Sequence, residues 1–267
     1  MLNKMPKKLL ILGGTQEAYE LAESLVAEFS PDQLIVISSL AGSTGNPKIP
    51  AGEVRIGGFG GLSGLINFLV MEKISMLVNA THPYASQIEK TALAATTELR
   101  LPYFRLNRSP WVKLPNDHWI EVLNMEAAAN YLIDNKTVFQ NELCKHRVFL
   151  TIGNRGLFFF RKCKKNNFVV RTVDPPKEAS SWLEAVFLEE RGPFTLENEL
   201  ALFRQNGITI LITKNSGGSS TYAKIEAARK LRVPVIMVAR PVSSLTGIYP
   251  TIDDTTDWIT KTYFHEL

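Results

Sequence analysis

The chain has 267 residues, of which 45% are hydrophobic and 21% are charged, with a formal net charge of +4. This length suits two globular domains, and the composition excludes a disordered protein. No apolar run reaches the roughly 18 residues that a membrane-spanning helix needs, and the first residues lack the apolar core of a secretory signal. The mild positive charge is too sparse to predict a nucleic-acid partner, although it would attract an anionic ligand. The two cysteines, Cys144 and Cys163, lack metal-ligand spacing, so we expect no metal site and a reducing, cytoplasmic location.

The first part of the chain alternates between apolar strands and amphipathic helices. Strands are predicted at residues 9–12, 34–37, 54–56, 76–78 and 103–106, and helices at residues 17–29, 62–70 and 86–99. Residues 107–120 are rich in Pro, Trp and Asn, which predicts a connection between domains. The alternation then resumes, with strands at 147–152, 168–173, 208–213 and 235–239 and helices at 125–133, 196–205 and 222–231. Such alternation predicts parallel sheets covered on both faces, in two α/β halves.

A Gly/Ser/Thr-rich loop at 213–224 follows an apolar strand and precedes a helix. Lys214 and Lys224 flank this loop, and its glycines would let backbone N–H groups approach a ligand closely. Gly13-Gly14-Thr15 follows the first strand in the same way, with Glu17 in the first helical turn. Ligands of open parallel sheets bind at the carboxyl ends of strands, so the two loops predict a cleft protein.

Other polar positions also follow strands. Residues 38–45 offer Ser and Thr hydroxyls but neither an acidic nor a basic side chain, which leaves the choice between NADH and NADPH open. Residues 55–64 hold five glycines, typical of a backbone that bends or is closely approached, or of a surface loop. His82 follows the strand at 76–78, either as a structural hydrogen-bonding residue or as a proton donor. Thr195 is the expected N-cap of the helix at 196–205.

Several catalytic motifs are missing from the sequence. We find no G-x-S-x-G, H-E-x-x-H, P-loop or C-x-x-C pattern, which disfavours α/β-hydrolases, zincins and P-loop NTPases. Hydride transfer from a nicotinamide requires none of these motifs, because the cofactor carries the chemistry.

Seven segments together resemble the precorrin-6A reductase family of cobalamin biosynthesis, over residues 9–241. They are residues 11–18 (ILGGTQEA), 38–42 (SSLAG), 55–61 (RIGGFGG), 80–83 (ATHP), 149–153 (FLTIG), 191–194 (RGPF) and 213–218 (TKNSGG). The resemblance implies NAD(P)H-dependent reduction of one double bond in precorrin-6A, or in its cobalt-containing counterpart, to the 6B form. It also implies an α/β fold with two Rossmann-like domains, placed at residues 1–115 and 116–267, with cofactor and substrate in an interdomain cleft.

The resemblance also implies site residues. The expected cofactor-binding residues are Gly13, Gly14, Thr15, Glu17, Ser39, Gly42, Gly58, Thr81, Ser216 and Gly217. The residues expected to bind the polycarboxylate tetrapyrrole substrate are Arg55, Arg191, Lys214, Ser219, Thr221 and Lys224. If the enzyme supplies a proton, Lys214 or Tyr222 is the first candidate and His82 the next, with solvent as the alternative. Ser43 stands where the family often has an arginine, so NADPH is expected and NADH remains possible.

Two other functions are compatible with the same patterns. One is an NAD(P)H reductase of a different conjugated metabolite, and the other is a dinucleotide-sensing regulatory module without chemistry. The sequence predicts neither the oligomeric state, nor whether the macrocycle carries cobalt, nor a role for residues 242–267.

Overall fold

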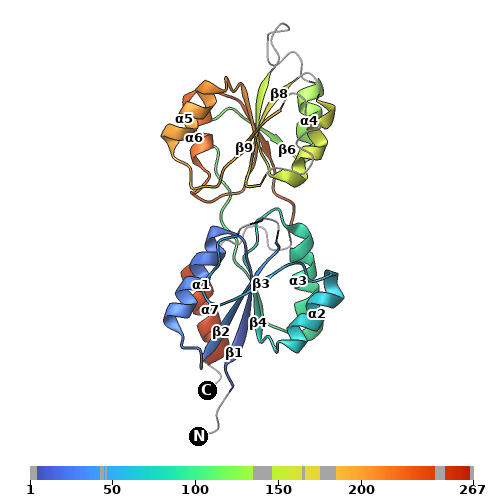
Figure 1. Cartoon of the computed structure of the whole chain (residues 1–267), viewed down its shortest axis with the longest axis vertical. Helices are drawn as coiled ribbons and strands as arrows, with labels where there is room; N and C mark the ends of the chain where they lie inside the picture. The colour runs from blue at the N-terminus through green and yellow to red at the C-terminus, as the bar shows by residue number, and fades with distance from the viewer. Residues whose placement is uncertain are drawn as a thin grey trace. The chain divides into compact units, whose positions relative to one another are not determined.

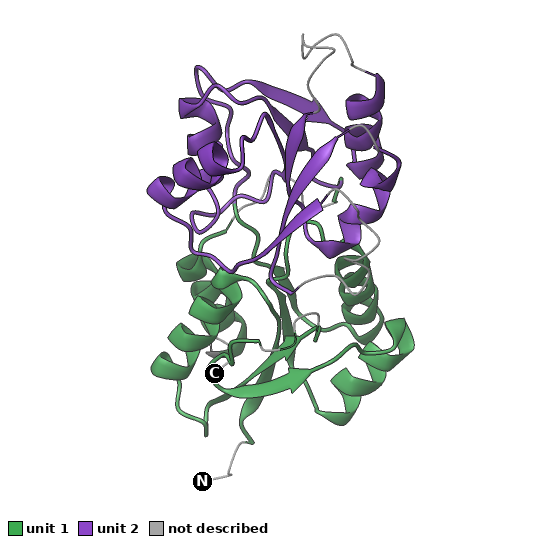
Figure 2. Ribbon diagram, turned by 45° about the horizontal axis from the view of Figure 1, so that its top comes forward, with its two compact units in different colours: residues 1–108, 242–267 green, residues 109–241 purple. Residues whose placement is uncertain are grey.

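The computed structural model describes residues 5–42, 45, 47–134, 146–163, 166–174, 185–243 and 250–264. The chain divides into two compact units, unit 1 (Met1–Arg108 with Val242–Leu267) and unit 2 (Ser109–Pro241), as Figure 2 shows. Each unit contains one parallel sheet with helices on both faces, which confirms the predicted α/β class (Figure 1). The predicted interdomain cleft stays a prediction.

Unit 1 contains a five-stranded sheet in the order β3-β2-β1-β4-β5, with every neighbouring pair parallel. This order corresponds to five of the six strands of the Rossmann order 3-2-1-4-5-6. The strands are β1 (Lys7–Leu12), β2 (Leu34–Leu40), β3 (Glu53–Ile56), β4 (Met76–Asn79) and β5 (Tyr103–Arg105). Helices α1 (Gln16–Glu28) and α7 (Ile252–Phe264) cover one face, and α2 (Gly61–Met71) and α3 (Ser86–Leu99) cover the other (Figure 1).

The alternation of side chains along β1 explains why both faces of this sheet are covered. Leu9 and Ile11 are fully buried in a cluster with the apolar face of α1, whereas Leu10 is fully buried in the cluster on the opposite face. An all-apolar strand of this kind is typical of a parallel sheet buried on both sides. The sheet therefore exposes mainly its edges.

The domain boundaries differ from the prediction. The structure divides the chain after Arg108 rather than after residue 115, and it places residues 242–267 in unit 1. The cause is α7, which packs on the same sheet face as α1: Ile259 is fully buried there, and the Trp258 ring lies 4.7 Å from that of Phe104. Tyr263 donates a hydrogen bond to the backbone carbonyl of Lys8.

Unit 2 contains a six-stranded parallel sheet in the order β6-β11-β10-β7-β8-β9. Its strands are β6 (Trp119–Val122), β7 (Arg147–Thr151), β8 (Asn167–Thr172), β9 (Ala185–Glu189), β10 (Ile210–Lys214) and β11 (Val235–Val238). Its helices are α4 (Met125–Asp134), the 3₁₀ helix η1 (Asn154–Lys162), α5 (Leu196–Gln205) and α6 (Ala223–Lys230). Helices α5 and α6 cover the face opposite to α4 (Figure 1). The sequence did not predict β6, β9, η1 or α7.

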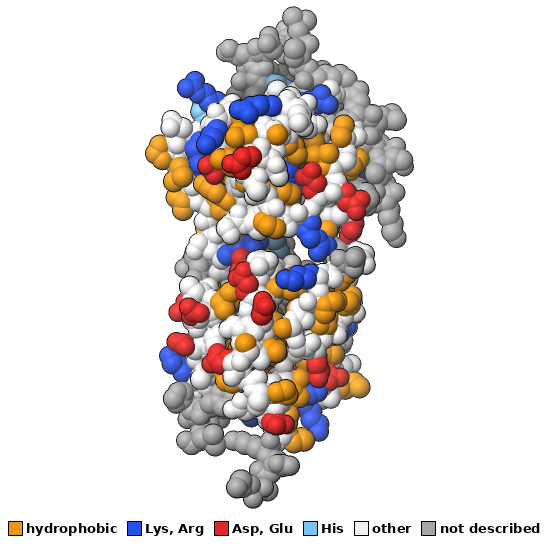
Figure 3. All heavy atoms as spheres, turned by 60° about the vertical axis from the view of Figure 1, so that its left-hand side comes forward, with side chains coloured by type: hydrophobic (Ala, Val, Ile, Leu, Met, Phe, Trp, Pro, Cys, Tyr) orange, Lys and Arg blue, Asp and Glu red, His pale blue; other side chains and the backbone are white. Residues whose placement is uncertain are grey.

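Among the described helices, none combines the length and the apolar character needed to cross a membrane. Figure 3 shows acidic and basic side chains interspersed on the face that it draws, so neither sign of charge covers a large continuous area there.

Candidate functional site

Each sheet has one point where the strand order reverses. In unit 1 the chain runs outward from β1 to β2 and β3, then returns to the other side of β1 with β4. In unit 2 it runs from β7 to β8 and β9, then returns to the other side of β7 with β10. Ligands of open α/β sheets bind at the carboxyl ends of the strands that flank such a point. Many of the predicted site residues lie at these two edges.

Thr15 ties the two strand ends of unit 1 together. As the N-cap of α1, its hydroxyl accepts a hydrogen bond from the N–H of Ala18 (3.3 Å) and donates one to the carbonyl of Ala80 (2.7 Å), directly after β4. Gly14 has a φ of 102°, and a Cβ built there would meet nothing within 4 Å. The turn is therefore fixed in place, while the backbone at Gly14 stays open to a ligand.

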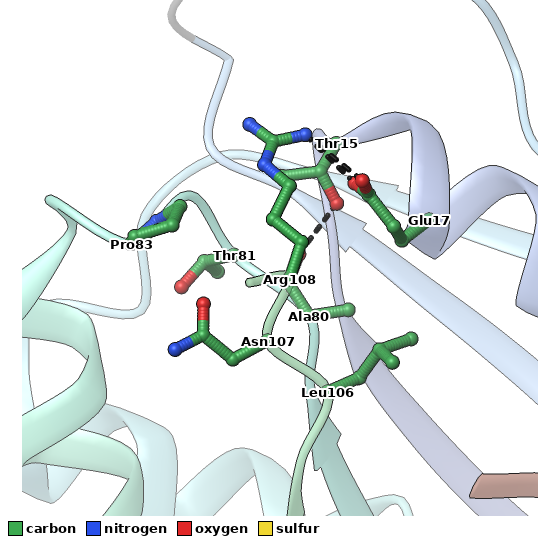
Figure 4. A pocket seen from close by; sticks show the side chains of 8 residues that line it. All are labelled: Thr15, Glu17, Ala80, Thr81, Pro83, Leu106, Asn107 and Arg108. Atoms are coloured by element: carbon green, nitrogen blue, oxygen red, sulfur yellow. Dashed lines mark hydrogen bonds and ion pairs between the residues drawn. The ribbon is translucent and has the colours of Figure 1, made fainter. Parts of the chain in front are cut away.

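A small pocket lies at this edge (Figure 4), lined by Thr15, Glu17, Ala80, Thr81, Pro83, Leu106, Asn107 and Arg108. Arg108 donates to both carboxylate oxygens of Glu17, at 2.9 and 3.0 Å, so this pair forms one wall. Thr81 and Asn107 lie on the other side (Figure 4). The Oδ1 atom of Asn107 is buried and has no hydrogen-bond donor within the described part of the chain. A buried acceptor of this kind is costly unless a ligand or water satisfies it.

A hydrogen-bond network holds Thr81 in place. The buried Asn79 side chain accepts from the N–H and the hydroxyl of Thr81, at 3.1 and 2.8 Å. Arg105 donates to the backbone carbonyls of Asn79 and Thr81, at 2.8 and 3.0 Å. Burial lowers the pKa of the Arg105 guanidinium. Sequence reasoning missed Asn79, Arg105, Asn107 and Arg108; their one sequence signal is that they end or follow the strands β4 and β5.

His82 lies in the turn between β4 and α3. Its Nδ1 accepts a hydrogen bond from the N–H of Tyr84 (3.2 Å), and its carbonyl accepts from Ala85 (2.8 Å). In the neutral ring this arrangement places the proton on Nε2.

The edge formed by β2 and β3 carries Ser39, Gly42, Arg55 and Gly58. Arg55 donates to the carbonyls of Gly57 and Gly58, the latter at 2.7 Å, and to the hydroxyl of Ser39 at 3.4 Å. Its guanidinium carbon lies 3.9 Å from the centre of the Phe59 ring. It thus organises the glycine-rich loop that it precedes.

Two other glycines at this edge are needed for local packing. Gly42 has a φ of 69° and packs against Ile56, whereas a Cβ at Gly64 would lie 1.7 Å from the carbonyl oxygen of Phe59. Ser43 and Thr44 lie outside the described residues.

Lys214 ends β10, at the reversal point of unit 2. Its Nζ lies 4.0 Å from the position that a Cβ would occupy on Gly153, in the loop after β7. Burial, with a smaller contribution from the positive charge of Arg155, lowers the pKa of Lys214 to about 8. Lysines with lowered pKa values at strand ends are typical of catalytic or anion-binding sites.

The loop after Lys214 is anchored to the segment that begins unit 2. The Asn215 side chain accepts from the N–H of Trp111 (2.7 Å) and donates to its carbonyl (3.1 Å), and the Trp111 indole donates to the carbonyl of Gly218 (2.9 Å). A Cβ on Gly217 would lie 2.1 Å from the carbonyl oxygen of Ser109, so glycine is required there. Ser216 is buried, and its carbonyl accepts from Arg240 at 3.1 Å.

Two of the predicted site residues on this loop turn inward. The hydroxyl of Tyr222 accepts a hydrogen bond from Arg229 (2.7 Å), which also pairs with Asp117 (2.8 Å). Lys224 is only 5% exposed, and its Nζ donates to the carbonyl of Thr221 and lies 4.9 Å from the centre of the Trp111 ring. Ser219 is exposed and Thr221 is half-buried, so both stay accessible to a ligand.

The segment 191–194 lies against the same loop. Arg191 is exposed, and the N–H of Phe194 donates to the carbonyl of Ser220 at 3.1 Å. The Phe194 ring lies 4.0 Å below the buried guanidinium of Arg171, which forms an ion pair with the fully buried Glu199 at 2.7 Å. The structure therefore brings Arg191, Ser219 and Thr221 to one region of unit 2.

Comparison with known proteins agrees with this architecture. The family model described as "Precorrin-6x reductase CbiJ/CobK" matches residues 8–260. The precorrin-6A reductase of Rhodococcus erythropolis is 40% identical, and the match covers 92% of this chain and 94% of the relative. The cobalt-precorrin-6A reductase of Priestia megaterium is 27% identical, and the match covers 92% of this chain and 95% of the relative. A solved structure titled "CobK precorrin-6A reductase" covers 96% of both chains at 34% identity, with a TM-score of 0.85. The chain therefore belongs to the precorrin-6x reductase family, a family of oxidoreductases of cobalamin biosynthesis.

Proposed function

We propose that this protein reduces one double bond of the precorrin-6A macrocycle in an NADPH-dependent reaction that gives precorrin-6B. The observation that best supports this proposal is the pocket at the reversal point of a Rossmann-like sheet, in a chain that belongs to a reductase family. Relatives named for the metal-free substrate are 36–40% identical, whereas those named for the cobalt form are 25–27% identical. This difference favours the metal-free substrate.

The residues of unit 1 fit a dinucleotide. The N-terminus of α1 and the open backbone at Gly14 suit a pyrophosphate, because unpaired N–H groups and the helix dipole attract anions. The Asn107 Oδ1 atom, which lacks a donor among the described residues, suits the amide N–H of a nicotinamide carboxamide, with Thr81 beside it. The chemistry that NADPH supplies when bound is hydride transfer.

Lys214 is the residue that we assign to the proton. With a pKa of about 8 it is mostly protonated at neutral pH, yet it gives up its proton more readily than an ordinary lysine. We propose that its ammonium group protonates the ring carbon next to the one that receives hydride. We remove Tyr222 from the candidate proton donors, because its hydroxyl accepts a hydrogen bond from Arg229 within unit 2. His82 and solvent are the competing sources.

Residues that bind the substrate carboxylates are proposed from exposure and charge. Arg191, Ser219 and Thr221 remain accessible, and the net charge of +4 would attract a polycarboxylate. Lys224 is only 5% exposed and donates to the carbonyl of Thr221, so we no longer place it among the carboxylate ligands.

A two-step experiment tests the proposal. The protein is titrated with NADPH and with NADH while nicotinamide fluorescence is followed, and then precorrin-6A or its cobalt form is added and nicotinamide absorbance is recorded. We expect tighter binding of NADPH and its oxidation on addition of precorrin-6A. Nucleotide binding without oxidation of the nucleotide when either macrocycle is added would favour a sensor or a reductase of another metabolite. Failure to bind either nucleotide would refute the enzyme proposal.

A further inference from the structure

We infer that Arg55 selects NADPH over NADH by binding the 2′-phosphate of the nucleotide beside the carboxyl end of β2. This inference rests on the proposed function only in taking unit 1 as the nucleotide-binding unit. Arg55 was expected from the sequence to bind the substrate, so its assignment changes from macrocycle to cofactor.

The position of Arg55 in the sheet is the first argument. In Rossmann folds the residues at the end of the second strand meet the adenosine ribose, where an acidic side chain selects NADH and a nearby arginine accommodates the 2′-phosphate. Here the end of β2 carries Ser38 and Ser39, and no acid. Arg55 is the residue of β3 in register with Ser39, and its Nη1 reaches the Ser39 hydroxyl at 3.4 Å.

The charge of Arg55 is the second argument. Its hydrogen bonds within the described residues go to two backbone carbonyls and one hydroxyl, and none of the ion pairs found there includes it. A guanidinium has five N–H groups, so these three bonds leave donors for a ligand. Stacking on Phe59 at 3.9 Å and on Phe68 at 5.2 Å fixes its plane. A prepositioned arginine without a carboxylate partner suits a phosphate, which it binds through two N–H groups.

The surroundings of β2 provide the third argument. A hollow on the other face of this strand is lined by Gly13, Gly14, Tyr19, Ser38 and Leu40, among others. Ser38 lines this hollow, and its hydroxyl is buried and has no hydrogen-bond partner within the described ranges. A ribose hydroxyl would satisfy it. The end of β2 thus combines an unsatisfied hydroxyl group with an unneutralised cation.

The backbone at Gly58, in the loop that Arg55 organises, is also open. Gly58, whose carbonyl accepts from Arg55, would place a Cβ where nothing lies within 4 Å. The loop that Arg55 organises is therefore open at Gly58, where a ligand group has room to approach the backbone.

The test compares dissociation constants for NADPH and NADH in the full-length protein and in R55Q and R55K, measured by nicotinamide fluorescence. A charge-assisted hydrogen bond to phosphate predicts that R55Q weakens NADPH binding about 10- to 100-fold. By the same reasoning, the affinity for NADH should change less than about threefold in R55Q. The affinity of R55K for NADPH should lie between those of the wild type and R55Q, because lysine keeps the charge but lacks the planar fork. The probe 2′,5′-ADP should compete with NADPH in the wild type and lose this ability in R55Q. Lys90→Gln removes an exposed charge from α3 of the same unit and serves as the matched control.

The outcomes separate this inference from the proposed function. If R55Q weakens NADPH and NADH equally, Arg55 merely holds the glycine loop and the inference is refuted. If nucleotide binding is unchanged but the KM for precorrin-6A rises, Arg55 is a substrate residue and the inference is likewise refuted, while the proposed function stands. If the wild type binds neither nucleotide, the proposed function fails first.

Discussion

The reversal points of the two sheets share a geometry but differ in how their charged groups are satisfied. In unit 1, Arg108 is paired with Glu17, and Arg105 is held by backbone carbonyls. In unit 2, Lys214 lies near Gly153 with Arg155 as the neighbouring charge, and its pKa falls to about 8. Hydrogen-bonded side chains such as those of Arg105 and Arg108 suit the positioning of a ligand, whereas a buried lysine with a lowered pKa suits proton transfer. We therefore propose a different task for each of the two edges.

The largest effect is expected from Lys214→Met, which removes the ionisable group from the edge of unit 2. General acid catalysis contributes about 10²- to 10⁴-fold, so kcat should fall at least about 100-fold while NADPH affinity changes little. Steady-state kinetics and nucleotide titration measure the two quantities. Lys230→Met, which removes an exposed lysine from α6, is the matched control. Unchanged turnover in K214M would remove Lys214 from the mechanism and leave His82 or solvent as the proton source.

The pH dependence tests the same residue without a substitution. If protonated Lys214 is required, kcat/KM should fall about tenfold per pH unit above the Lys214 pKa of about 8. Arg155→Gln removes a positive charge that disfavours the protonated amine, so this limb of the profile should move to higher pH. A profile that is flat through pH 9 in the wild type, or a limb that R155Q leaves in place, would contradict the assignment.

Much of the fold could be predicted from the sequence, because hydrophobic periodicity is a local signal. The strands around Leu10, Val78, Leu150 and Ile212 are continuous apolar runs, and all four are confirmed as parallel strands. The predicted cap at Thr195 is also confirmed, since its hydroxyl accepts from Asn198 at 3.3 Å. The elements that were missed have weaker patterns. β9 is a half-exposed edge strand, and α7 begins with acidic residues and packs against a sheet formed by residues far away in the chain.

The candidate site was less predictable, because the direction of a side chain depends on distant partners. Tyr222 and Lys224 lie on a loop that looks ligand-binding in sequence, yet Arg229 and Trp111 hold them inside unit 2. Asn107 carries no motif, and only the fold brings it beside Thr81. The loops that follow strands therefore predicted that these residues lie at the carboxyl edge of a sheet. They did not predict which individual side chains face a ligand there.

A moderate effect is expected at the edge of unit 1 from Asn107→Ala. If the buried Oδ1 atom accepts from the nicotinamide carboxamide, its loss should weaken NADPH binding by about 1 to 1.5 kcal/mol, or roughly tenfold. Asn107→Asp, which keeps an acceptor, should lose less affinity. Nucleotide titration measures both variants. If both bind NADPH like the wild type, the carboxamide binds elsewhere and the assigned orientation of the cofactor is wrong.

The smallest effect concerns the cap that links β1 to β4. Thr15→Ala removes the acceptor for the Ala18 N–H and the donor to the Ala80 carbonyl, so the free energy of unfolding should fall by about 1 kcal/mol. Thr15→Ser keeps the hydroxyl and should restore most of this loss.

Thr195→Ala, which removes the equivalent cap from α5 in unit 2, is the matched control. It should lower the free energy of unfolding by a similar amount, about 1 kcal/mol. Of the two alanine variants, only T15A should also weaken NADPH binding, because its hydroxyl lies in the pocket of unit 1. Equal nucleotide affinities in T15A and T195A would mean that the cap stabilises the fold without shaping the cofactor site.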